Sequence, residues 1–326
     1  LDLAVYYPHA GMPSFWKWAG AFVLLAATTA FVLRLARNHP CFPVGWFWYL
    51  ITLLPVIGFI QIGAQAMADR YTYIPLIGPF IMVVWGAYGA AGDRKRLRAA
   101  LTVFFVAVMA ALAVSTANQL SYWRDSRSLY GRALAVTEGN YLIHNNLGNE
   151  LAAAGEVDEA LVHYLEAVRL YPDYADGHYN LANTYAGLGQ DDQAVYHYLE
   201  AIRIKPDYEK AYNNLGVTLA RRGNLDQAMI YFSEALRMNP ASVDGRYNLG
   251  SALAARGRFA EAITHFERIL SLNPDAMRVR VRLAQVYWLS GERDKALKES
   301  EIIGAGDEKL ACDLKAWIER SGSGEK

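Results

Sequence analysis

The sequence has little cysteine and, in its first third, little charge. Only Cys41 and Cys312 are present among 326 residues, which excludes a disulfide framework and a cysteine metal cluster. Residues 1–118 hold eight Lys or Arg and three Asp or Glu, whereas the remainder holds 24 and 29. The net charge of zero therefore hides an apolar, basic part followed by a polar, acidic part, and each needs its own interpretation.

Signatures of several common chemistries are also missing. We find no nucleotide phosphate loop, zinc-ligand spacing or serine triad, so the residues alone suggest no cofactor, and they leave open whether a metal is used. The acidic balance of residues 119–326 argues against a nucleic-acid partner.

Four apolar stretches are long enough to cross a bilayer. They cover about residues 16–36, 44–63, 74–92 and 98–118. A hydrocarbon core roughly 30 Å thick needs about 20 mainly apolar residues in a helix. Buried helices of a soluble protein are the alternative, but four such stretches with so few charges make that alternative the weaker one. We predict an integral membrane part with four transmembrane helices.

The basic residues of the short loops predict the orientation. Arg34 and Arg37 follow the first stretch, and the run 94–98 after the third contains four basic residues. Such loops favour the cytoplasm. Residues 1–15, the loop after the second stretch and everything after residue 118 are then expected on the extracytoplasmic side, which would be periplasmic or luminal.

The loop between the second and third stretches contains an adjacent acid and base, Asp69 and Arg70, followed by Tyr71, Tyr73 and Pro75. The planar guanidinium of Arg donates two parallel hydrogen bonds and suits a phosphate. Pro75 fits the start of the next helix, because its missing N–H would have no helical partner there. The alternative is that Asp69 and Arg70 only neutralise each other at a helix end.

The second part repeats itself every 34 residues. The recurring residues are Leu147, Leu181, Leu215, Leu249 and Leu283; Gly155, Gly189, Gly223, Gly257 and Gly291; Ala160, Ala194, Ala228, Ala262 and Ala296; and Pro172, Pro206, Pro240 and Pro274. This period is typical of tetratricopeptide repeats, which are antiparallel helix pairs. We predict an all-α fold with repeats at about 141–174, 175–208, 209–242, 243–276 and 277–310. A junction and half repeat (119–140) would precede them, and a capping helix with a disordered tail from Ser321 onward would fill 311–326.

A second series precedes the repeat leucines. It consists of Asn146, Asn180, Asn214 and Asn248, and Arg282 breaks it. On the first helix of each pair, this position should face the concave groove of the array. A carboxamide both donates and accepts, so a row of them can hold an extended peptide backbone. The series resembles that of the peptide-binding repeats of O-linked N-acetylglucosamine transferase. The alternative is that these asparagines serve helix packing alone.

Five histidines fall on the predicted repeat helices: His144, His163, His178, His197 and His265. Two pairs of them, His144 with His178 and His163 with His197, are one repeat apart. Repeat duplication explains this spacing better than metal binding does.

Residues 3–9, the loop 66–78 and the repeats that follow resemble the C-terminal portion of GT-C membrane glycosyltransferases, similar to the transmembrane and tetratricopeptide O-mannosyltransferases. The resemblance implies a polyprenyl-phosphate sugar as donor and an extracytoplasmic active site. It places Arg70 and Tyr71 near the lipid phosphate, with Asp69 and Tyr73 as further candidates. The catalytic acid of the family lies in an early loop that has no counterpart here. Because the chain also begins with Leu, we expect it to be the C-terminal part of a longer protein, inactive alone.

Two functions are compatible with these patterns. In the first, the chain is part of an integral-membrane glycosyltransferase whose repeats bind the acceptor polypeptide outside the cytoplasm. In the second, it is a membrane-anchored scaffold that recruits protein partners and performs no chemistry. Both include the lipid bilayer and a polypeptide as partners.

Overall fold

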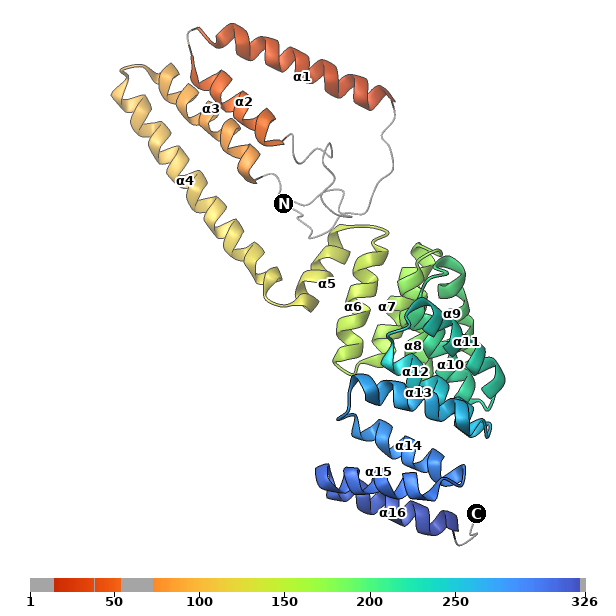
Figure 1. Ribbon diagram of the computed structural model, residues 1–326. Coiled ribbons are helices and arrows are strands. Elements are labelled where there is room, and N and C mark those ends of the chain that lie inside the picture. The colour runs from red at the N-terminus through yellow and green to blue at the C-terminus, as the bar shows by residue number, and fades with distance from the viewer. Residues whose placement is uncertain (1–14, 38, 54–72, 323–326) are drawn as a thin grey trace. The chain divides into compact units, whose positions relative to one another are not determined.

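The computed structural model describes residues 15–37, 39–53 and 73–322, and every secondary-structure element in these ranges is a helix (Figure 1). The chain divides into two compact units, residues 1–170 and 171–326.

The apolar part contains four helices. They are α1 (Phe15–Leu35), α2 (Cys41–Leu53), α3 (Tyr73–Ala91) and α4 (Lys95–Leu120). Two of them hold apolar segments long enough to cross a membrane, Ile74–Ala91 and Lys95–Asn118, while the apolar segments Ala19–Leu35 and Cys41–Thr52 are shorter. The prediction of four spans is therefore not confirmed. The second predicted span, 44–63, coincides with α2 only up to Leu53, and its remainder lies outside the described residues.

Glycine lets α2 and α3 pack closely in an antiparallel arrangement. A Cβ atom added to Gly45 would collide with the carbonyl oxygen of Gly78, and one added to Gly78 would collide with that of Gly45. Small residues at a helix crossing allow this approach, as is common between membrane helices. The indole Nε1 of Trp48 donates to the carbonyl oxygen of Ile74 at 3.0 Å. Pro75 lies buried in the first turn of α3, where it was expected.

A tight turn joins α3 to α4. Gly92 adopts a φ of 52° in this turn, a conformation that glycine reaches without a Cβ penalty. Beside the turn, the hydroxyl of Tyr88 on α3 lies 2.5 Å from Oγ1 of Thr102 on α4. The rings of Tyr88 and Phe105 stack with their centroids 6.4 Å apart. The two long apolar helices therefore form an antiparallel hairpin.

The repeats follow a short junction. After the 3₁₀-helix η2 (Ser121–Trp123), Asp125 caps α5 (Ser126–Val136) by accepting a hydrogen bond from the Ser128 backbone N–H at 2.7 Å. The helix pairs are α6 (Tyr141–Ala153) with α7 (Val157–Leu170), α8 (Ala175–Gly187) with α9 (Asp191–Ile204), α10 (Glu209–Arg221) with α11 (Leu225–Met238), α12 (Val243–Ala255) with α13 (Phe259–Leu272), and α14 (Met277–Leu289) with α15 (Arg293–Gly306). We number the 34 positions of each repeat from the first residue of its first helix.

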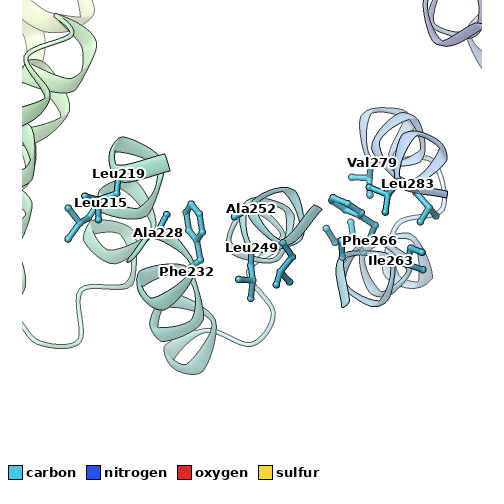
Figure 2. Close-up of a cluster of buried hydrophobic side chains, with 14 of the residues drawn as sticks. Leu215, Leu219, Ala228, Phe232, Leu249, Ala252, Ile263, Phe266, Val279 and Leu283 are labelled. Atoms are coloured by element: carbon cyan, nitrogen blue, oxygen red, sulfur yellow. The ribbon is translucent and has the colours of Figure 1, made fainter. Parts of the chain in front are cut away.

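The recurring residues each have a structural role. The glycines at position 15 have φ between 73° and 87° and end the first helix in a left-handed conformation. The alanines at position 20 are fully buried. At position 24, the ring of Phe232 fills the space left by Gly216, where an added Cβ would lie 2.6 Å from the ring. Figure 2 shows Phe232 between Leu215 of its own repeat and Leu249 of the next.

A further helix, α16 (Glu308–Gly322), covers the last repeat. Its residues Ala311 and Leu314 are buried together with Ala284 and Ile303. Asp307 caps it by accepting from the Leu310 N–H at 3.0 Å. This helix includes Ser321, so the prediction that the tail begins at Ser321 is wrong. An amphipathic last helix closes the apolar side of an array that would otherwise face water.

Candidate functional site on the first helices

The predicted asparagine series occupies position 6, in the middle of each first helix. Its members, Asn146, Asn180, Asn214 and Asn248, are all half-buried. The leucine at position 7 that follows each of them is buried. Position 6 therefore lies at the edge of the core, where a carboxamide can contact either the neighbouring helix or a ligand.

Asn214 uses its amide inside the array. Its Nδ2 donates to Oδ1 of Asn183 at 3.0 Å and to the hydroxyl of Tyr179 at 3.2 Å, both on α8. Its Oδ1 accepts from Nδ2 of Asn213 at 3.3 Å. Since a primary amide has two N–H groups, both donors of Asn214 are engaged. For this residue the packing alternative accounts for the donors.

Asn248 is less engaged. Its Nδ2 donates to Oδ1 of Asn213 at 2.9 Å, and among the described residues its second N–H and its carbonyl oxygen have no partner. The hydrogen bonds that Asn214 and Asn248 donate to the preceding first helix involve positions 5, 6 and 9. We call the surface that these three positions form on α8, α10, α12 and α14 the ladder face.

A tyrosine–asparagine hydrogen bond links the two helices of a repeat in the first two repeats. The Tyr164 hydroxyl donates to Oδ1 of Asn149 at 2.8 Å, and the Tyr198 hydroxyl donates to Oδ1 of Asn183 at 2.6 Å. Burial raises the pKa of Tyr164 to about 12, so the phenol keeps its proton at neutral pH. The sequence analysis missed this bond, although Tyr at position 24 occurs with Asn at position 9 and could have revealed it.

The third and fourth repeats lack this bond. Phe232 accompanies Val217, and Phe266 accompanies Ser251, whose buried hydroxyl has no hydrogen-bond partner in the part of the chain that is described. The hydroxyl of tyrosine and its acceptor therefore vary together from repeat to repeat, while the aromatic ring is kept.

Four of the histidines pair within a repeat. The Nδ1 atoms of His144 and His163 lie 3.0 Å apart, and so do those of His178 and His197. The pairs join positions 4 and 23, which are 19 residues apart, on facing helices. The described residues hold no group of three or more side chains suited to a metal ion. Sequence reasoning noted the 34-residue spacing but missed that the contact runs between the two helices of one repeat.

The tautomers of the second pair follow from its surroundings. His178 Nε2 lies 3.0 Å from the carbonyl oxygen of Pro172, which can only accept, so this nitrogen carries a proton. In the neutral pair, His178 Nδ1 then accepts from Nδ1–H of His197. Burial, with a smaller contribution from His178, lowers the pKa of His197 to about 4. His197 is therefore neutral at pH 7.

In the second, fourth and fifth repeats, position 4 also ties the repeat to the one before it. Its side chain donates to the carbonyl oxygen of the proline that lies six residues earlier. These contacts are His178 Nε2 to Pro172 at 3.0 Å, Arg246 Nη2 to Pro240 at 2.5 Å and Arg280 Nε to Pro274 at 2.9 Å. Prolines that end the second helices thus also provide the acceptors of the junctions between repeats.

The loop candidates are not among these contacts. Asp69, Arg70 and Tyr71 lie outside the described residues, and Tyr73 is the first residue of α3. Their proximity to a lipid phosphate stays a prediction.

The helix pairs, their 34-residue register and their stacking define a tetratricopeptide-repeat fold. Sequence profiles described as TPR repeat match residues 148–189 and 187–223, and profiles described as tetratricopeptide repeat match 209–242 and 253–305. Solved structures agree. YrrB, described as a TPR protein with an unusual peptide-binding site, aligns with a TM-score of 0.51 and 22% identity over 57% of this chain and 97% of its own. A tetratricopeptide repeat protein from Parabacteroides merdae aligns with a TM-score of 0.52 and 21% identity over 64% and 85%.

Among curated proteins, the chain is similar to O-mannosyltransferases of the resembled type. Protein O-mannosyl-transferase Tmtc2 of Drosophila melanogaster is 30% identical over 145 residues, which is 44% of this chain and 15% of the relative. Protein O-mannosyl-transferase TMTC1 of Homo sapiens is 28% identical over 134 residues, 40% of this chain and 15% of the relative. The expected resemblance is confirmed. The aligned part is a small fraction of these relatives.

Proposed function

We propose that this chain is part of an integral-membrane glycosyltransferase that takes its sugar from a polyprenyl phosphate and holds the acceptor polypeptide on its tetratricopeptide repeats. The similarity to two named O-mannosyltransferases carries this proposal. The apolar helices that directly precede the repeats support it, since a lipid-linked donor requires a membrane part. We expect the catalytic acid to lie outside this chain.

The α3–α4 hairpin supports a common side for the loop candidates and the repeats. If α3 and α4 both span the membrane, their antiparallel packing returns Leu120 to the side from which Tyr73 enters. The basic residues next to the turn, Arg94 to Arg98, favour the cytoplasm for the turn itself. Residue 70 and the repeats would then both be extracytoplasmic. This conclusion needs only two spans, and α1 and α2 complete the proposed four.

The ladder face supports the acceptor role. Asn248 keeps one amide N–H and its carbonyl oxygen available, which matches the alternating donors and acceptors of an extended backbone. Asn146, which lies on α6 outside the ladder face, forms no side-chain hydrogen bond with the described residues. Asn180 and Asn214 complete the proposed series, with Asn214 contributing through the remaining lone pair of its Oδ1.

Replacement of Arg70 tests the enzymatic proposal. Arg70→Ala, in the longer protein that contains this chain, should lower sugar transfer roughly 10-fold to 100-fold, because one charge-assisted hydrogen bond to the lipid phosphate is lost. The matched control is Arg94→Ala, which removes a basic residue from the turn on the opposite side. Transfer that is unchanged by Arg70→Ala, measured at limiting lipid donor, would contradict the phosphate role.

The scaffold function remains the second candidate because of one observation. The similar array of YrrB makes up nearly its whole chain, and YrrB is described as having an unusual peptide-binding site. A repeat array can therefore serve a binding function without a membrane enzyme. If the longer protein binds peptide but transfers no sugar from a polyprenyl-phosphate donor, the scaffold function is the correct one.

A further inference from the structure

Two histidine pairs of the array share one geometry. The Nδ1 atoms lie 3.0 Å apart both in His144 with His163 and in His178 with His197. The ring centroids are 5.2 Å apart in each pair, and the ring planes meet at 37° and 36°. Duplication of a repeat accounts for the 34-residue spacing between the pairs. It does not explain why two Nδ1 atoms converge from facing helices within each repeat.

The separation of these Nδ1 atoms is that of two neighbouring ligands on one metal ion. Metal–imidazole bonds of about 2.0 Å place adjacent nitrogens about 2.8 Å apart on a square-planar Cu²⁺ ion and roughly 3.3 Å apart on a tetrahedral Zn²⁺ ion. The observed 3.0 Å lies between these two values. A small rotation of the rings therefore suffices to bring both nitrogens into contact with an ion.

The surroundings of the second pair prepare one nitrogen for this role. His178 donates its Nε2–H to the carbonyl oxygen of Pro172 at 3.0 Å, which leaves a lone pair on its Nδ1. A backbone carbonyl bound to the far nitrogen is a usual companion of a metal-binding histidine, because it fixes the tautomer and the orientation of the ring. The first pair lacks this proline, since Glu138 stands six residues before His144. The second pair should therefore hold an ion more tightly.

Access and charge at the second pair also suit a cation. His178 is buried and His197 is half-buried, so water can complete the coordination shell from the side of His197. Glu200 follows His197 by one helical turn, and its negative charge acts on that ring. Because Arg203 holds the Glu200 carboxylate at 3.0 Å, the ion would have two protein ligands.

We propose that each histidine pair binds one divalent transition-metal ion, of the Zn²⁺ or Cu²⁺ type, through its two Nδ1 atoms. In the second pair, the Nδ1 proton of His197 moves through water to Nε2 of the same ring, so no proton is lost overall. The ion then joins the two helices of the repeat. This site goes beyond the proposed function, because neither the sugar donor nor the acceptor polypeptide requires it. The later repeats should bind none, since positions 4 and 23 are Tyr212 with Tyr231, Arg246 with His265, and Arg280 with Glu299.

The test counts bound ions by isothermal titration calorimetry. Zinc chloride and copper chloride are titrated separately, at pH 7, into the whole chain without a histidine tag in phosphatidylcholine nanodiscs. Two ions should bind, one of them about tenfold more tightly, since an outer hydrogen-bond partner such as Pro172 typically contributes 10-fold to 100-fold. His197→Gln should remove the tighter site and His163→Gln the weaker one. The matched control is His265→Gln, which removes the histidine at position 23 of the fourth repeat and should leave both sites intact.

Amide hydrogen exchange gives a second readout and shows whether each variant is folded. Bound metal should slow exchange in α6–α9 and leave α12–α13 unchanged, because an ion that binds only the folded repeat stabilises it. In His178→Tyr/His197→Tyr, which copies the third repeat, α8–α9 should stay folded and gain no protection from metal.

Binding of only one of the two metals would support the site and identify its coordination geometry. Retention of both ions by His163→Gln/His197→Gln would overturn the proposal, as would binding of neither metal to the unaltered chain. Loss of an ion in His265→Gln would overturn it too, because that histidine has no facing histidine.

Discussion

The second repeat (175–208) and the fourth (243–276) have helices of the same length in the same register, yet their interiors differ in polar chemistry. In the second, the Tyr198 hydroxyl is bonded to Asn183, whereas in the fourth Phe266 accompanies Ser251, whose hydroxyl is unpartnered within the described structure. The aromatic ring is common to both because the gap beside position 8 must be filled. The hydroxyl is optional, provided that its acceptor is lost with it.

The pair at positions 4 and 23 differs as well. The second repeat has His178 with His197, while the fourth has Arg246 with His265, whose Nδ1 is buried without a partner in the described chain. In both repeats the residue at position 4 still donates to a proline carbonyl. The contact between repeats is therefore kept while the contact within a repeat changes.

The largest expected effect comes from removing the ring. Tyr198→Ala and Phe266→Ala should each destabilise their repeat by about 3–5 kcal/mol, through lost burial and the cavity left behind. Tyr198→Ala should cost more, because Asn183 also loses a donor. Amide hydrogen exchange in α8–α9 and in α12–α13, followed as urea is added, measures the loss of stability in each repeat. Equal costs in the two repeats would show that the hydroxyl adds nothing.

The next largest effect should come from acid, which acts on a half-buried histidine in each of the two repeats. The folded-state pKa of His197, about 4, lies below its ordinary value of 6.5, so the folded state favours the neutral ring. This stabilisation is complete above pH 6.5 and is lost as the pH falls from 6.5 through 4, by roughly 2 kcal/mol. Burial, and then Arg246, lower the pKa of His265 as well. Hydrogen exchange at pH 7 and pH 4.5 should show both repeats weakened.

A double variant isolates the histidine pair as the cause. His178→Tyr/His197→Tyr reproduces the third repeat, where Tyr212 and Tyr231 lie 6.1 Å apart between ring centroids. It should remove the acid sensitivity of α8–α9 and leave that of α12–α13 unchanged. Undiminished acid sensitivity in α8–α9 would exclude the pair as its origin.

The smallest effect comes from exchanging the hydroxyl alone. Tyr198→Phe should cost about 1 kcal/mol, the usual net value of a hydrogen bond whose acceptor keeps another donor. Here Asn183 retains the bond from Asn214. The reciprocal change Phe266→Tyr/Ser251→Asn should transplant the bond and be neutral or stabilising. A loss of stability in that double variant would indicate that the fourth repeat has no room for the hydroxyl.

The sequence predicted the repeat fold well because each recurring residue has a local reason. A left-handed turn requires glycine at position 15, and a close helix approach requires alanine at position 20. The contacts that it did not reveal, such as Tyr198 with Asn183 and His178 with His197, join residues 15 and 19 apart on antiparallel helices. Their identities vary between repeats, so a search for recurring residues overlooks them.

The apolar part was predicted less well for a different reason. Hydropathy finds apolar length but does not fix where a helix begins or ends, and α4 covers Lys95–Leu120, which is longer at both ends than the predicted fourth span of 98–118. The close approach of Gly45 and Gly78 also depends on how two helices cross, which a single-helix pattern does not contain. Of the site candidates, the asparagine series lies on the first helices at the edge of the core, and its predicted place in a concave groove stays a prediction. Asn214 of this series donates hydrogen bonds to Asn183 and Tyr179. These bonds join two repeats, so the pattern of a single helix could not reveal them.

The bond from position 4 to the preceding proline carbonyl bears on how such an array can change its length in evolution. Donor and acceptor belong to consecutive repeats, and the same two positions supply them at the three junctions where it occurs. Loss of residues 209–242 as one block would bring Arg246 six residues after Pro206, the spacing that it now has from Pro240. A unit of 34 residues can thus be gained or lost with every remaining junction chemically intact, so the reach of the array is open to variation by whole repeats.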